Sequence, residues 1–422
     1  MVVKFSGSMF DEVRIDLKNF LESWDSNKIL YLHHTPGDVE VLIVGGGPAG
    51  CLSAIEIGSR SEDHNITILE EHPLPGFPVQ CAGLISRDCY QKLRNYVSDK
   101  CHVNDIKGAF LFSPDGNHIK MEGRSKAVVI ERKVLDSELL REASIYATVK
   151  PKTRFEGANL SASSGKAEAV SLSPQGTHKI PYDVLIGADG CTSSVARTFG
   201  FERPNFFSAL QFECEFEPID PQFVELFFGR EYTDSFFGYA IPIDESTARL
   251  GVVARENPSS HFRNLLERHP SVSRRVNLKK ITELNAGAIP TNLINFVKDN
   301  VALIGDSGGM VKPYTGGGLY YHLIAAETLG RTFPNLQEFR NEYLKKMEIE
   351  YRVGSKILKL YSSLSDKDYN NLVRVGKEGN VEELVKNLHM DSPSSLVKII
   401  PSVLKIFSRS PRLFTKIGRI MV

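Results

Sequence analysis

The sequence has no excess of either charge and no long apolar run. Its 51 lysine and arginine residues balance 51 aspartate and glutamate residues, so the formal net charge is zero. Because nucleic-acid binding needs a prominent basic excess, this balance argues against nucleic acid as the main partner. No apolar run reaches the ~18 residues of a membrane span. The first twenty residues contain acids and no unbroken apolar stretch, unlike a secretory signal. We therefore expect a soluble protein of the cytoplasm.

Cysteine and tryptophan are also scarce. The six cysteines stand at positions 51, 81, 89, 101, 191 and 214, with no Cys-x-x-Cys pair and no metal-ligand spacing. This scatter predicts free thiols in a reducing compartment and no metal site. The single tryptophan, Trp24, lies in residues 1–37, an N-terminal extension that the pattern leaves unassigned. A length of 422 residues favours two or three domains.

Three segments share one pattern, in which a short apolar run ends in glycine and in acidic or small residues. They are Glu40–Gly50, Asp183–Gly190 and Asn300–Gly309, and each precedes a helix-like stretch. Ile66–Leu69 is a further run of this kind, ending at Glu70. Runs rich in β-branched residues that enter glycine turns and then helices are typical of buried parallel strands.

The residue pattern changes between Asp183–Gly190 and Asn300–Gly309. Residues 207–255 carry short aromatic and valine-rich runs broken by Pro, Gly and Asp, which predicts antiparallel strands. Residues 109–120 read as a hairpin with its turn at Asp115-Gly116. We therefore predict an α/β fold with three parts: a discontinuous Rossmann-like domain (38–71, 127–202 and 286–335), an inserted antiparallel-sheet substrate domain (72–126 and 203–285) and a helical C-terminal region (336–422).

The first glycine turn has the spacing of a dinucleotide-binding fingerprint, Gly45-x-Gly47-x-x-Gly50, with Ala49 inside it. In such a turn the first glycine permits the bend, the second lets the backbone approach a pyrophosphate, and the third allows close helix packing. The following helix offers unpaired N–H groups to the phosphates. Glu70 lies twenty residues beyond Gly50, where a carboxylate would bind a ribose.

A second glycine–acid turn at Gly305-Asp306 favours FAD over a nicotinamide cofactor, because a simple dehydrogenase needs no second wall for a longer ligand. With it, the chain resembles the large FAD family typified by aromatic hydroxylases. The resemblance implies that Asp306 binds the ribityl hydroxyls and that Arg132, at a helix start, helps to hold FAD. The shared motifs are Gly-Gly-Gly-Pro-Ala-Gly, Ala188-Asp189-Gly190 and Gly305-Asp306.

Two further segments are similar to those of archaeal geranylgeranyl reductases, which saturate the isoprenoid chains of archaeal lipids. The segments are Pro78–Gly83 and Gly309–Gly318, and the resemblance covers about residues 38–345. It implies that both segments face the reacting ring, through Cys81, Ala82, Gly83, Gly309, Gly316, Gly317 and Gly318. The N–H groups of Gly316 to Gly318, which open a helix, would stabilise an anionic reduced flavin.

The family's substrate-pocket motif, Tyr-x-Trp-x-Phe-Pro, is altered here. The corresponding residues are Phe237, Tyr239, Ile241 and Pro242. Their apolar character predicts an isoprenoid pocket, and the changed aromatic pattern leaves the chain length and head group open. Lys312, in the second flavin-facing segment, is either a loop charge or a partner for the flavin or a lipid phosphate.

The resemblance implies an FAD-dependent reductase that saturates C=C bonds of geranylgeranyl chains. An isolated alkene is not electrophilic, so a proton must accompany the hydride. Cys81 and Tyr239 are the candidate catalytic acids, and ordered water is a third candidate source of the proton. The electron donor stays open between NAD(P)H, a reduced deazaflavin and a ferredoxin. Two alternatives also stay open: an aromatic-hydroxylase-type monooxygenase, and a prenyl-lipid-binding escort without catalysis.

The C-terminal tail combines basic charge with apolar residues at helical spacing. Residues 396–422 hold six lysines and arginines and no acid. This pattern suits a helix in an anionic lipid interface, and it predicts a peripheral contact with the inner face of the cell membrane. It equally suits a stripe that closes over the protein's own core.

Overall fold

The predicted parallel strands form one six-stranded sheet. The computed structural model describes residues 39–73, 76–77, 81–159, 167–386 and 388–421, so the N-terminal extension with Trp24 and residues 78–80 lie outside the described part. The strand order is β16-β17-β10-β1-β2-β6. All neighbours are parallel except β16 with β17. Their bounds are β1 (Val39–Val44), β2 (His64–Leu69), β6 (Ala147–Lys150), β10 (Val184–Gly187), β16 (Val297–Lys298) and β17 (Val301–Leu303).

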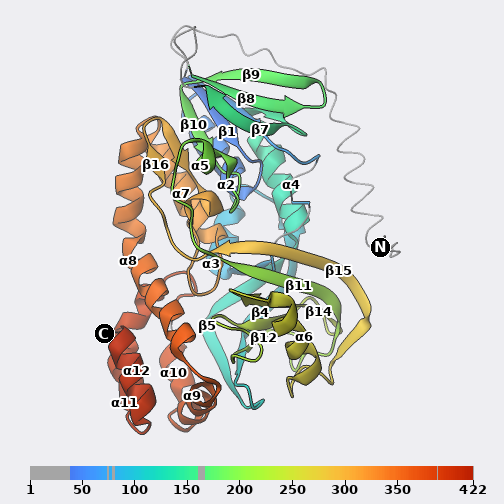
Figure 1. Cartoon of the computed structure of the whole chain (residues 1–422), viewed down its shortest axis with the longest axis vertical. Helices are drawn as coiled ribbons and strands as arrows, with labels where there is room; N and C mark the ends of the chain where they lie inside the picture. The colour runs from blue at the N-terminus through green and yellow to red at the C-terminus, as the bar shows by residue number, and fades with distance from the viewer. Residues whose placement is uncertain (1–38, 74–75, 78–80, 160–166, 387, 422) are drawn as a thin grey trace. The chain divides into compact units, whose positions relative to one another are not determined.

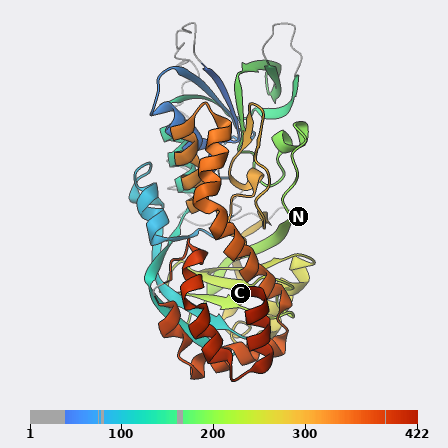
Figure 2. The ribbon, with the colours of Figure 1, turned by 90° about the vertical axis from the view of Figure 1, so that its left-hand side faces the viewer.

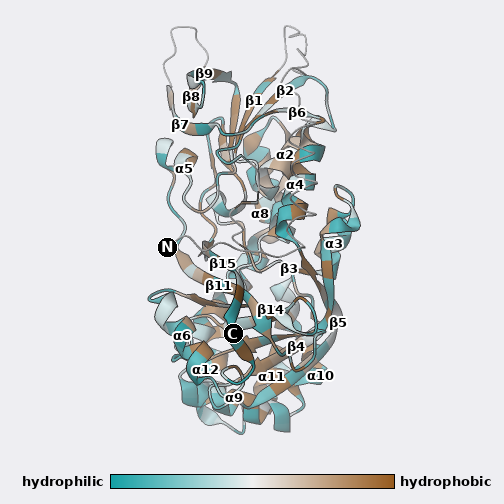
Figure 3. Ribbon diagram, turned by 90° about the vertical axis from the view of Figure 1, so that its right-hand side faces the viewer, coloured by the Kyte–Doolittle hydropathy of each residue, from teal (hydrophilic) through white to brown (hydrophobic). Residues whose placement is uncertain are grey.

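Helices cover this sheet and begin close to the carboxyl ends of its strands (Figure 1). The helix α2 (Pro48–Gly58) follows β1 directly and packs against α7 (Leu319–Thr332) and α4 (Arg132–Ala143). Both β10 and β17 lead into short helices, α5 (Ser194–Thr198) and η2 (Gly305–Gly308). The ends of three neighbouring strands therefore converge, as expected for a ligand crevice in an open α/β sheet. Figure 3 shows hydrophobic segments gathered in the strands around β1.

A second sheet of eight strands has the order β15-β11-β14-β13-β12-β4-β5-β3. Its pairs are antiparallel except β12 with β4, and the predicted hairpin joins β4 to β5. Strands β5 and β15 cross the predicted domain limits at 127 and 286. The bounds are β3 (Leu84–Ser86), β4 (His102–Phe112), β5 (His118–Ile130), β11 (Phe206–Phe216), β12 (Phe223–Phe227), β13 (Gly238–Pro242), β14 (Thr247–Ala254) and β15 (Val276–Pro290).

The two faces of this sheet are covered by different elements because successive side chains alternate between them. Phe110 and Phe112 face a cluster that includes Phe262 of α6 (Pro258–Arg268). Ala109 and Leu111 of the same strand face the opposite cluster, which contains Tyr239 and is completed by the C-terminal helices. A smaller third sheet consists of β7 (Arg154–Asn159), β8 (Ala167–Ser173) and β9 (Gly176–Tyr182). The chain also forms α3 (Arg87–Leu93), η1 (Asp99–Cys101) and η3 (Pro393–Ile399).

The C-terminal region is helical, as predicted, and it lies beside the second sheet (Figure 2). In the tail, Phe407, Leu413 and Ile417 are buried in the cluster that contains Tyr239. The apolar stripe therefore closes over the protein's own core. Val397 and Phe414 keep 48% and 42% of their surface exposed. The helices are α8 (Leu336–Ser363), α9 (Asp366–Glu378), α10 (Val381–Val385), α11 (Ile400–Phe407) and α12 (Pro411–Met421). Within the described part of the chain, no helix is both long and apolar enough to span a bilayer.

Candidate active site

A cavity of about 1140 Å³ extends from the carboxyl ends of β1 and β2 to one face of the eight-stranded sheet. All the predicted site residues line it except four, which are Gly50, Gly305, Gly309 and Pro242. These four pack behind the wall: Gly50 against the carbonyl oxygen of Gly45, for example, and Pro242 at the buried end of β13. The structure thus brings described residues of both segments that were predicted to face the flavin, and most of the altered substrate motif, to one cavity.

The fingerprint glycines play different structural roles. Gly45 has φ +109°, and a Cβ built on it would lie 2.3 Å from the carbonyl oxygen of Ala188. A Cβ on Gly50 would lie 2.0 Å from the Gly45 oxygen, so both positions exclude any side chain. A Cβ on Gly47 would meet nothing within 4 Å. The turn is therefore tight on its inner side and open toward the cavity, where a pyrophosphate would approach.

Glu70 lies at the end of β2 and is 6% exposed. One carboxylate oxygen accepts the Gly46 backbone N–H at 2.8 Å, and the other accepts the His72 backbone N–H at 2.8 Å. The ring Nδ1 of His72 lies 2.9 Å from that second oxygen. Glu70 thus anchors the glycine turn while lining the cavity, a structural role that the motif reading did not include.

Asp306 and Asp189 differ in what their carboxylates contact. Asp306 keeps 37% of its side chain exposed and faces the cavity, with His322 Nε2 3.3 Å away. Asp189 accepts hydrogen bonds from the Ser193 hydroxyl and from the backbone N–H groups of Ser194 and Val195, at 2.6–3.0 Å. Asp189 therefore caps α5, whereas Asp306 presents an acceptor to a ligand.

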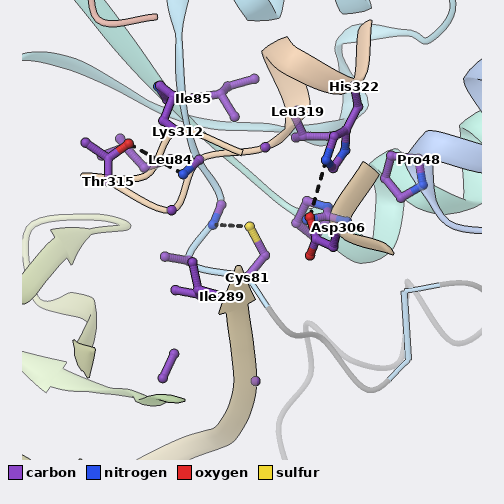
Figure 4. Close-up of a pocket in the computed structure, with 18 of the residues that line it drawn as sticks. Pro48, Cys81, Leu84, Ile85, Ile289, Asp306, Lys312, Thr315, Leu319 and His322 are labelled. Carbon is purple, nitrogen blue, oxygen red and sulfur yellow. Dashed lines mark hydrogen bonds and ion pairs between the residues drawn. The ribbon is translucent and has the colours of Figure 1, made fainter. Parts of the chain in front are cut away.

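Arg132 and Cys81 meet in the cavity wall. The guanidinium of Arg132 donates two hydrogen bonds of 2.9 Å to the carboxylate of Asp136. Burial opposes its charge, but Asp136 and the Cys81 thiol, within hydrogen-bonding reach, outweigh that and raise the pKa of Arg132. The Cys81 thiol also accepts the Gly83 backbone N–H at 3.4 Å (Figure 4).

Arg249 of β14 fixes the segment that carries Cys81. Only 5% exposed, it donates to the carbonyl oxygens of Ala82 (3.2 Å) and Ile130 (2.9 Å). It also pairs with Glu131, the N-cap residue of α4, and with Glu213 of β11. A cation of the second sheet thereby holds both the flavin-facing turn and the start of the helix that carries Arg132. Sequence reasoning missed Arg249, since no local motif marks it.

Lys312 makes a buried ion pair. Its Nζ lies 2.7 Å from Asp391 Oδ1, and the two side chains are 4% and 8% exposed. The second oxygen of Asp391 accepts a short hydrogen bond from Ser86, and Lys312 also donates to the Met390 carbonyl oxygen. Of the alternatives for Lys312, a solvated loop charge is wrong because the side chain is buried. It ties the flavin-facing loop to the C-terminal region.

The far end of the cavity is apolar except around Tyr239. The phenol of Tyr239 donates to Gln211 Oε1 at 2.9 Å. Burial, and to a smaller extent the nearby Cys81, raise the pKa of Tyr239. Gln211 was not predicted because its β-strand context gives no chemical signal. The apolar wall includes Ile106, Leu111, Val224, Leu226, Phe237 and Val253.

His322 is a further residue that the motifs did not single out. It stands one helical turn after Gly318, on the face of α7 that meets the cavity. The i+4 spacing from the glycine run was the available signal.

The fold and this cavity combine a dinucleotide-type glycine cradle with a pocket built by an antiparallel sheet. The chain belongs to the family described as "Lycopene cyclase protein", whose family model matches residues 40–348.

Several named proteins are similar to this chain over most of its length. Digeranylgeranylglycerophospholipid reductase 2 of Methanothermobacter thermautotrophicus is 28% identical over 395 residues, covering 87% of this chain and 98% of the relative. A geranylgeranyl bacteriochlorophyll reductase-like protein of Thermoplasma acidophilum has a TM-score of 0.75 at 20% identity, covering 88% of this chain and 99% of that one. A flavin-dependent brominase has a TM-score of 0.65 at 17% identity and the same coverage. The predicted family resemblance and fold class are confirmed.

Proposed function

We propose that this protein is an FAD-dependent reductase that saturates C=C bonds of geranylgeranyl chains in archaeal membrane lipids or their precursors. The observation that carries the proposal is the single cavity that joins the glycine cradle to an apolar pocket, with Cys81 and Tyr239 between them. The names of the reductase relatives support the substrate class.

The residues present fit FAD. Gly47 and Gly190 leave open space where a Cβ would stand, and Asp306 offers a carboxylate toward the cavity. Gly45 to Gly50 would hold the pyrophosphate, Asp306 the ribityl hydroxyls, and the loop at Gly316–Gly318 the ring. Reduced FAD supplies the hydride. The protein supplies orientation, exclusion of water and a proton.

The proton is assigned to Cys81 rather than Tyr239. The Tyr239 hydroxyl already donates to Gln211, and its raised pKa makes it a weak acid. Cys81 faces the cavity, and its sulfur is an acceptor toward the Gly83 N–H and the nearby Arg132 guanidinium, so neither contact uses a thiol proton as the donor. Tyr239 then positions the substrate, and the apolar wall keeps water from an alkene carbon that gains positive charge.

The test is to reduce the purified protein anaerobically, add a geranylgeranyl lipid and follow product mass. Each saturated bond adds two hydrogens, about 2 Da. A second candidate is cyclisation, favoured by the description of the matched family, and it would leave the mass unchanged. A monooxygenase would add about 16 Da under oxygen. If the lipid keeps both its mass and its chromatographic retention, the reductase and cyclase proposals are both contradicted.

The electron donor and the membrane contact are finer proposals. NAD(P)H, a reduced deazaflavin and a reduced ferredoxin are to be compared as donors by bleaching of the bound flavin. For the membrane, the exposed Phe414 and the exposed basic side chain of Arg409 favour contact through the tail. Phe414→Ser should reduce flotation with anionic liposomes, while Phe206→Ser, an exposed aromatic on the second sheet, should not. Equal flotation of wild type, Phe414→Ser and Phe206→Ser would exclude the tail as the membrane contact.

A further inference from the structure

A buried histidine next to the flavin-facing loops has no well-formed hydrogen bond. His322 is 9% exposed, and neither ring nitrogen has a hydrogen-bond partner among the described residues. Its Nε2 lies 3.3 Å from Asp306 Oδ1, which is within ion-pair distance but lacks the direction of a good hydrogen bond. Figure 4 shows the imidazole turned toward Asp306.

The imidazole occupies space that two glycines leave for it. A Cβ on Gly318 would lie 2.6 Å from His322 Nε2, and a Cβ on Gly305 would lie 3.6 Å from it. Larger residues at Gly318 would displace the ring from Asp306. The contact between His322 and Asp306 therefore depends on the absence of a side chain at Gly318 and Gly305.

Such a side chain needs an explanation other than packing. A buried polar group without a partner costs about 1–3 kcal/mol, and an alanine or leucine in α7 would avoid that cost. His322 lies along the cavity wall, but neither ring nitrogen is exposed, so direct contact of these atoms with a ligand does not account for the residue. The group that His322 can reach is the Asp306 carboxylate, which lines the cavity and keeps 37% of its side chain exposed.

We propose that His322 is a positioning residue that aligns the Asp306 carboxylate for the ribityl hydroxyls of FAD. This inference rests on the proposed function only in taking FAD as the ligand. An imidazole N–H that donates to one carboxylate oxygen restricts rotation of the group and leaves the other oxygen as acceptor. With FAD bound, His322 would donate to one oxygen of Asp306 while the other oxygen accepts from the ribityl hydroxyls.

The experiment measures the FAD dissociation constant of apoprotein by flavin fluorescence. His322→Ala should raise the constant about tenfold, equivalent to about 1.4 kcal/mol. His322→Gln, whose amide N–H can still donate, should recover most of that loss. In an Asp306→Ala background, His322→Ala should have no further effect, because the residue acts through Asp306.

Tyr321→Phe is the matched control, since it removes a neighbouring buried hydroxyl of α7 that also has no described partner. It should leave FAD affinity unchanged. Thermal unfolding of each apoprotein separates affinity from folding. Should His322→Ala not fold, the comparison of His322→Gln with His322→Met carries the same test.

Three results would overturn the inference: unchanged affinity in His322→Ala, no recovery in His322→Gln, or an additive effect with Asp306→Ala. Wild-type protein that binds no FAD would overturn the proposed function as well. Normal wild-type binding with unchanged variants overturns the role of His322 alone.

Discussion

The two ends of the cavity are built by different means. The nucleotide end uses backbone: glycine turns at the ends of parallel strands, where Gly45 has no room for a side chain and Gly47 has ample room. The substrate end uses side chains from distant strands, such as Tyr239 of β13 and Gln211 of β11, closed by C-terminal helices. A site built from backbone needs a fixed local sequence pattern, whereas a site built from side chains needs only a suitable cavity shape. Substitutions at the two ends of the cavity should therefore have different effects on the protein.

The largest effect is expected from the glycine pair at the nucleotide end. Gly45→Ala combines a left-handed φ with a 2.3 Å approach to Ala188, and it should lower the free energy of unfolding by about 4 kcal/mol or more. Gly47→Ala should fold with stability within about 0.5 kcal/mol of wild type and lose only FAD affinity. Denaturant titration and flavin fluorescence measure both. Similar losses of stability in the two variants would contradict the distinction.

The next effect lies where the two ends meet. Lys312→Met leaves the Asp391 carboxylate buried without its cation and should destabilise the protein by about 3–5 kcal/mol. The double variant Lys312→Met/Asp391→Leu should regain most of that stability, because no buried charge remains. Chemical unfolding of the set is the measurement. A double variant no more stable than Lys312→Met would show that the ion pair is not the cause.

Acid should weaken the face of the second sheet that lies away from the cavity. Burial among Phe112, Phe227 and Tyr232 lowers the pKa of His269 from 6.5 to about 4. The unfolded chain therefore takes up a proton that the folded chain refuses, and stability falls as the pH drops from about 6.5 to about 4. The loss reaches about 3 kcal/mol at the lower limit.

His269→Phe should flatten that part of the stability–pH curve. His178→Asn, at an exposed position of β9, should leave it unchanged. Urea unfolding between pH 4 and pH 7 provides the comparison. An unaltered slope in His269→Phe would assign the acid sensitivity to other groups.

The smallest change in free energy is expected at the reacting centre. Cys81→Ala should lower the rate of alkene reduction about 100-fold, or about 2.7 kcal/mol, because general acid catalysis is lost. FAD affinity should change little. Cys89→Ala, a buried cysteine on α3, should keep the activity. Equal rates for wild type and Cys81→Ala would reduce Cys81 to a packing residue.

The motifs predicted the nucleotide end well because its chemistry is written in short segments. Strands β1, β10 and β17 and the open position at Gly47 follow from local pattern, and so does the hairpin of β4 and β5 in the second sheet. The partners of the motif residues could not be read in this way. Asp391 is 79 residues from Lys312, and Arg249 is 167 residues from Ala82. Only tertiary folding brings such pairs together.

The C-terminal tail shows a second limit of prediction from sequence. Its stripe of apolar residues allowed two predictions, a lipid contact or a core contact, since periodicity reports a buried face without naming what buries it. The burial of Phe407, Leu413 and Ile417 in the cluster of Tyr239 assigns the stripe to the core. The part of the apolar stripe that can still contact a membrane is the exposed surface around Phe414.

The Lys312–Asp391 pair also has a consequence for how the protein matures on the ribosome. By the time residue 332 has been synthesised, the chain contains every strand and the helix α7, so the parallel sheet can already form. Lys312, however, cannot form its ion pair until Asp391 has been synthesised, 79 residues after the lysine itself. Until then Lys312 lacks its partner, and the cavity lacks the part of its wall that Met390 and Asp391 form. A competent binding site therefore emerges late in translation, as one of the last steps rather than with the sheet that carries the cofactor motifs.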